Sequence, residues 1–140
     1  MSEMILSHNE VKQLMCWCSS SSVLNGETTY APITGTISSD ATLNRRKSLI
    51  PTNGFVYGAI ARVDSEPLGG DTWVLTLLKN GSPTAITITL TTGSYIDIED
   101  SANKVEFAKG DELAWRIVPT GTPAGLYIQA SLIIYIEEAF

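Results

Sequence analysis

The sequence is poor in the side chains that catalyse reactions. It has one histidine, His8, and two cysteines, Cys16 and Cys18, among 140 residues. Nucleophilic catalysis needs a nucleophile, a base and a group that orients the base, and we interpret His8 as a surface residue rather than a base. No Gly-x-Ser-x-Gly motif and no glycine-rich phosphate loop before a helix is present. We therefore predict no catalytic residues, no cofactor and no enzymatic activity.

Charged side chains are also scarce, and the basic ones are outnumbered. They make up 17% of the chain, below the roughly 25% that is usual for soluble domains. Nine basic and fifteen acidic residues give a net charge of −6, which argues against nucleic acid as a partner because phosphates must be neutralised. We interpret the one basic cluster, Arg45-Arg46-Lys47, as a solvated turn or a set of carboxylate partners. A subunit that hides surface in an oligomer would explain the low charge.

Long hydrophobic runs are missing as well. No segment approaches the roughly 20 apolar residues of a membrane-spanning helix, so no membrane insertion is predicted. The start, MSEMILSHNEVKQLM, has no positively charged region before an apolar run. We expect the protein to be made in a cytoplasm without a signal peptide.

The two cysteines are too few for a metal site in one subunit. Four soft ligands are typical of structural zinc sites, and His8 is the only further nitrogen ligand of that kind. We interpret Cys16 and Cys18 as buried free thiols. An interchain disulfide and a metal site on a subunit axis remain as alternatives.

The clearest structural signal that is present runs from Thr72 to Thr91. Asn80-Gly81 separates two β-rich runs, and both residues tolerate the positive φ that a tight hairpin turn requires. In the second run three apolar residues (Ile86, Ile88, Leu90) alternate with three threonines (Thr87, Thr89, Thr91). Because alternate strand residues point to opposite faces, this predicts an antiparallel hairpin with one buried face and one solvated face.

Turn signals at intervals of roughly 8–12 residues predict an all-β sandwich or barrel of about ten antiparallel strands. We expect residues 16–140 to form one domain and residues 1–15 to form an N-terminal arm or short helix. Ser7 and Glu10 have capping-box spacing, followed by an apolar stripe at Val11, Leu14 and Met15. This segment either covers one end of the domain or anchors it in a larger assembly. Trp73 and Trp115 are expected in the core, because each alternates with aliphatic residues.

Two strands are apolar on both faces. In the last one, residues 126–137, Tyr127, Ile133 and Tyr135 fall opposite the aliphatic face. In residues 55–63, strict alternation puts Phe55, Tyr57, Ala59 and Ala61 opposite Val56, Gly58 and Ile60. Apolar residues on a second face predict contact with another subunit. We name Tyr57, Tyr127, Ile133 and Tyr135 as the predicted subunit interface, with burial under a loop of the same chain as the alternative.

One acidic cluster, Asp97, Glu99 and Asp100, is a candidate calcium site. Calcium takes roughly six to eight oxygen ligands, and this cluster lacks the glycine spacing of a dedicated calcium loop. The same acids could formally serve a hydrolase, although no partner base accompanies them. We interpret them as the charged end of an edge strand.

Several turn motifs together resemble a β-rich domain of tailed-phage and prophage structural proteins. They are Lys79-Asn80-Gly81, Ala108-Lys109-Gly110-Asp111 and Pro119-Thr120-Gly121-Thr122-Pro123-Ala124, in that order, with residues 45–63 upstream. The resemblance covers roughly residues 43–137. It implies a jelly roll similar to the trimeric tumour-necrosis-factor and complement globular-head domains, in which the first and last strands meet near the three-fold axis. It implies no catalytic residues.

The resemblance leads to the expectation of a non-enzymatic virion component that assembles as a homotrimer. Such domains occur in fibres, spikes or head decorations, and the N-terminal segment would then contact other virion proteins. The main alternative is a carbohydrate-binding or adhesion module that recognises a host-surface glycan, since jelly rolls host sugar sites in other families. A calcium-dependent hydrolase on a β scaffold is a third class.

Overall fold

The computed structural model describes residues 12–22, 27–36, 40–91, 104–124 and 127–137. Strands dominate these residues, and the only helical segment among them is η1 (Leu43–Arg45), a single 3-10 turn. The predicted all-β class is therefore confirmed. Within the described residues, no helix has the length and apolar character needed to cross a membrane.

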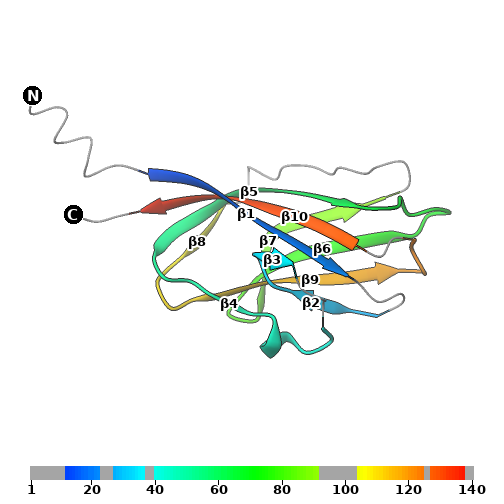
Figure 1. The fold of residues 1–140 in the computed structure, drawn as a ribbon, viewed down its shortest axis with the longest axis horizontal. Helices are drawn as coiled ribbons and strands as arrows, with labels where there is room; N and C mark the ends of the chain where they lie inside the picture. The colour runs from blue at the N-terminus through cyan, green and yellow to red at the C-terminus, as the bar shows by residue number, and fades with distance from the viewer. Residues whose placement is uncertain (1–11, 23–26, 37–39, 92–103, 125–126, 138–140) are drawn as a thin grey trace, which may run out of the picture.

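The strands form two sheets (Figure 1). The first has the order β3-β1-β10-β5-β8, with β1 (Lys12–Ser22), β3 (Gly35–Thr36), β5 (Asn53–Val63), β8 (Val105–Phe107) and β10 (Tyr127–Glu137). The second has the order β2-β9-β6-β7, with β2 (Thr29–Ala31), β6 (Thr72–Lys79), β7 (Ser82–Leu90) and β9 (Glu112–Thr120), and β4 (Ser48–Leu49) also pairs with β9. Neighbours are antiparallel except β1 and β3.

The strand pairs are nested around the Asn80-Gly81 turn. β6 pairs with β7, β5 with β8, β2 and β4 with β9, and β1 with β10. Two further pairings, β10 with β5 and β9 with β6, join these pairs into sheets. The register Lys12↔Glu137 places the start of β1 beside the end of β10, as Figure 1 shows.

The central turn forms as the sequence predicts. Asn80 and Gly81 have φ values of 51° and 82°, the left-handed values that a two-residue hairpin turn requires. In β7 the three aliphatic side chains are buried and Thr87 and Thr89 are exposed. The alternation thus sets which face of this hairpin meets the core.

Both sheets contribute to one hydrophobic core. Trp73 and Trp115 are 0% and 1% exposed, which confirms that they are core residues. Trp73 Nε1 donates a 3.0 Å hydrogen bond to the Ala124 carbonyl oxygen, so its polar atom is satisfied at the edge of the core. From the first sheet, β10 buries Ile128, Leu132 and Ile134 against these residues. Burial between two sheets is therefore the main stabilising interaction.

The predicted N-terminal helix is wrong for the residues that can be compared. Residues 12–15 belong to β1, whose ladder with β10 runs from Lys12 to Ser22. Lateral pairing with a long neighbouring strand outweighs the weak helical signal of so short a segment. Residues 1–11 lie outside the described part of the chain.

Strict alternation in β5 is also wrong, because the strand contains a β-bulge. The pairing with β10 passes from Ile134↔Val56 to Ile133↔Gly58, so Tyr57 is an extra residue on the β5 side. After Tyr57, the residues that regular alternation would place on the outer face are buried, and those that it would place in the core face outward. Ala59 and Ala61 are buried, whereas Ile60 is 43% exposed. The bulge therefore turns Tyr57 and Ile60 toward the same outer face.

Asn80 also ties its hairpin to the turn before β9. Its Nδ2 donates to Asp111 Oδ1 at 3.0 Å, and its Oδ1 accepts from the Glu112 N–H at 2.9 Å. The Asn80 amide, followed by the Ala108 N–H, holds the pKa of Asp111 below its ordinary value. A lowered native pKa adds stability above the unfolded pKa of roughly 4, and this stability is lost as the pH falls through the lower native pKa.

We predict that Asn80→Asp lowers the melting temperature by several degrees at pH 7, because it replaces a donor by a second carboxylate beside Asp111. The deficit relative to wild type should shrink as the pH falls below about 4 and the carboxylates are protonated. Asn80→Gly is the control for charge: it keeps the positive φ and removes both side-chain hydrogen bonds without adding a carboxylate. The pH-dependent part of the deficit should therefore appear in Asn80→Asp and not in Asn80→Gly. A wild-type melting temperature for Asn80→Asp at pH 7 would contradict the interpretation.

Candidate functional site

The outer face of the first sheet carries a cluster of aromatic side chains. Phe55 and Tyr135, which are cross-strand partners, stack with ring centroids 5.2 Å apart and planes at 24°. Tyr57 meets Tyr135 edge to face at 5.5 Å and 85°. Both arrangements are preferred by aromatic pairs. We call Phe55, Tyr57, Ile133 and Tyr135 the aromatic patch.

The patch is partly open to solvent. Tyr57 is 38% exposed, while the other three members are half-buried. Lys104 lies with its Nζ 5.1 Å from the Phe55 ring centroid, a distance typical of a cation–π contact. Three of the four predicted interface residues, Tyr57, Ile133 and Tyr135, thus belong to one cluster.

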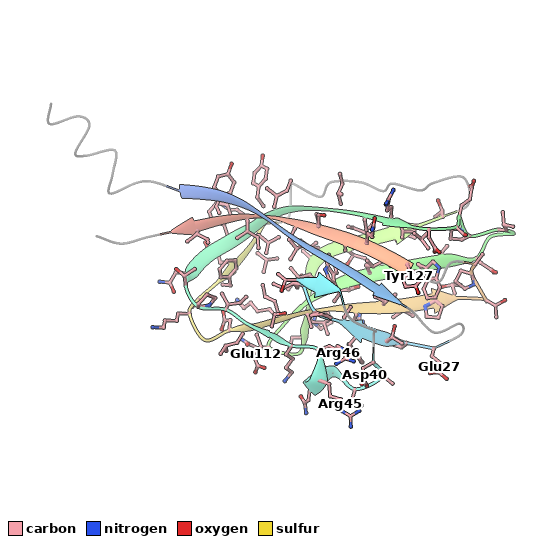
Figure 2. All side chains as sticks on the ribbon, in the orientation of Figure 1. Glu27, Asp40, Arg45, Arg46, Glu112 and Tyr127 are labelled. Carbon is pink, nitrogen blue, oxygen red and sulfur yellow. The ribbon has the colours of Figure 1, made fainter. Side chains whose placement is uncertain are left out.

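Tyr127, the fourth predicted interface residue, lies elsewhere. It begins β10, whereas Tyr135 is near its end, and eight residues of strand span roughly 27 Å. Figure 2 labels Tyr127 at the end of β10 away from the chain termini. Its side chain is 53% exposed. Alternation predicts the same face for all four residues, because it gives the face of a residue and not its place along the strand.

The basic cluster forms ion pairs within the chain. Arg45 Nη1 and Arg46 Nη2 lie 3.4 and 3.6 Å from Asp40 Oδ2, and Figure 2 shows these three residues together. Lys47 Nζ lies 3.9 Å from Glu112 Oε1. The backbone N–H of Thr42, ahead of Arg45, holds the pKa of Asp40 below its ordinary value. The interpretation of this cluster as a set of carboxylate partners is confirmed.

The segment that carries these ion pairs is also held by backbone hydrogen bonds. Asp40 also exchanges backbone hydrogen bonds of 2.8 and 3.0 Å with Tyr30 in β2. Ile50, ten residues later, pairs with the turn before β9 through Asp111 and Gly110. The Asp40–Ile50 segment is thereby held to the second sheet at both ends.

The candidate calcium residues, Asp97, Glu99 and Asp100, lie outside the described residues. Within the described residues, no group of three or more histidine, cysteine, aspartate or glutamate side chains is placed to hold a metal. The side chains of Cys16 and Cys18 also lie outside what is described, although the backbone register places Cys16 opposite Ile133.

Comparisons of the chain with protein-family models, with curated proteins and with solved structures gave no match.

Close backbone packing supports the aromatic patch from beneath. Gly54 pairs with Ile136 in β10 and with Phe107 in β8. A Cβ at this position would collide with the Tyr135 carbonyl oxygen and lie 2.9 Å from Phe107 Cζ. Gly54 thus lets three strands approach where the aromatic rings are held.

We predict that Gly54→Ala lowers the free energy of unfolding by about 1–3 kcal/mol, the usual cost of overpacking, because a backbone carbonyl cannot move aside without disturbing the ladder. Urea unfolding followed by circular dichroism measures the loss. Ala85→Val, which adds bulk at an exposed position of β7, is the control and should cause little change. Equal effects of the two substitutions would contradict the role of Gly54.

Proposed function

We propose that this protein is a non-enzymatic structural subunit that assembles with copies of itself through the aromatic patch. The observation that carries the proposal is the stacked Phe55–Tyr135–Tyr57 cluster on the outer face of the first sheet. Tyrosine and phenylalanine are enriched at the centres of protein interfaces. Rings already held in place lose little side-chain entropy on association.

We propose further that the sandwich is a jelly roll. The nested pairs support this, because a long antiparallel hairpin rolled up on itself brings β10 beside β5 and β9 beside β6. On this view β2 and β4 are two parts of one interrupted strand, since both pair with β9. Residues Asn80-Gly81 are then the tip of the rolled hairpin.

A homotrimer on a viral particle is the assembly that we propose. The trimer and the viral location come from the resemblance of residues 43–137 to phage structural domains. The position of β1 beside β10 supports the trimer, because the first and last strands would have to lie together to meet near a three-fold axis. The second copy would cover Tyr57, Ile133 and Tyr135.

We predict that Ile133→Asp reduces the solution mass toward that of the 15.1 kDa subunit, because a charge beside the stacked rings would be buried without a partner in the assembly. Light scattering coupled to size exclusion measures the mass, and circular dichroism checks that the β-fold is kept. The matched control is Thr87→Asp, which places the same charge on an exposed position of the second sheet. An unchanged mass for Ile133→Asp would refute assembly through this patch.

The viral location is tested separately by gene context. We expect genes for capsid or tail proteins beside the gene for this chain. A neighbourhood of metabolic genes would count against a virion component, while leaving assembly through the patch intact.

A further inference from the structure

A different feature lies on the same sheet face, between the aromatic patch and the start of β10. A depression between β5 and β10 is lined by Ile60, Ala61, Arg62, Gln129 and Ser131. The register pairs Arg62 with Gln129 and Ile60 with Ser131. None of these residues belongs to the aromatic patch.

The polar atoms of this depression are mainly hydrogen-bond donors. Arg62 Nε donates to Gln129 Oε1, which fixes the two planar groups against each other. A guanidinium has five N–H donors and a side-chain amide has two. Among the described residues, no hydrogen-bond partner is found for the terminal nitrogens of Arg62 or for the Gln129 amide nitrogen, and these donors can bind a ligand. The ion pairs among the described residues involve other basic side chains. The pair therefore suits a ligand that is rich in acceptors.

Apolar surface accompanies these donors. Tyr127 is two residues before Gln129 on the same face, and this spacing is roughly 7 Å. Tyr127 and Ile60 are 53% and 43% exposed. Asp64 Oδ1 accepts a 3.1 Å hydrogen bond from the Tyr127 N–H. A negative charge therefore lies near the backbone of Tyr127, so an acidic ligand would direct its carboxylate toward Arg62.

A pyranose ring matches this combination. It has an apolar face of C–H groups that packs on an aromatic ring, and a rim of oxygen acceptors. A carboxylate on the ring adds the bidentate partner for which a guanidinium fork is shaped. A nucleic-acid strand fits less well, because a chain with a net charge of −6 presents a single arginine here.

We propose that this depression binds an acidic sugar of the uronic-acid type, with the sugar carboxylate on Arg62 and Gln129 and the sugar ring against Tyr127. The site is open, so it would hold one residue of a longer acidic polysaccharide. The aromatic patch uses other residues of this face, although Ile133 is only two residues, roughly 7 Å, from Ser131. Substitutions that affect one site and not the other therefore test whether the two activities are separable.

The test uses the full chain labelled with ¹⁵N and titrated with methyl glucuronide or methyl glucoside, following amide shifts in β5 and β10. We expect the glucuronide to bind about tenfold more tightly, the size of one charge-assisted contact at an exposed site. Arg62→Gln should abolish this preference, and Tyr127→Ala should weaken both sugars. Lys109→Gln removes an exposed cation elsewhere and is the matched control.

Equal binding of the two sugars, absence of shifts with either, or an unchanged preference in Arg62→Gln would overturn the proposal. The mass of each variant is measured in parallel. A protein that assembles normally but does not bind the glucuronide refutes the sugar site alone. Sugar binding retained in Ile133→Asp is the result expected if the two sites are separate.

Discussion

The β-bulge at Tyr57 is the constraint on which the outer face of the first sheet depends. A strand has a period of two, so one inserted residue exchanges the faces of every residue that follows. Before the bulge, Val56 packs into the core; after it, Ala59 and Ala61 do so. The bulge residue itself projects outward beside Tyr135. Without the insertion, Ile60 and Arg62 would face the core, and Ala59 and Ala61 would face the solvent. Burying the Arg62 guanidinium would then lower the stability of the fold.

The same bulge divides the outer face into two chemically different parts. Near the end of β10, the outward-facing side chains of β5 and β10 are aromatic, and Phe55 stacks on Tyr135. Near the start of β10, the outward-facing side chains are polar, and Arg62 donates a hydrogen bond to Gln129. Side chains directly across a ladder interact most strongly, so the register of β5 and β10 fixes which residues meet in each part. The proposed assembly surface and the proposed ligand surface thus adjoin on one sheet without sharing a residue.

Much of this arrangement could be predicted from the sequence, because it depends on local patterns. The Asn80-Gly81 turn, the alternation in β7 and the burial of Trp73 follow from backbone sterics and period two. The face of Ile133 and Tyr135 followed from the same rule. The strand at Lys12 could not be predicted, since its neighbour β10 lies more than a hundred residues away in the chain and only the tertiary pairing overrides the local helical pattern.

The faces of the residues after Tyr57 in β5 could not be predicted from this strand alone. Gly58 is a signal for a bulge, because an isolated glycine within a strand often marks one. It does not fix which residue is inserted, since small and aromatic residues are compatible with both faces. The choice is made by β10, whose own alternation is unbroken from Ile128 to Ile134 and keeps Leu132 and Ile134 in the core. The backbone hydrogen bonds between β5 and β10 can continue on both sides only if one residue of β5 is left unpaired, and that residue is Tyr57. The depression beside Arg62 therefore depends on how β5 pairs with β10. The face on which Arg62 lies can be predicted only when the partner strand and its register are known.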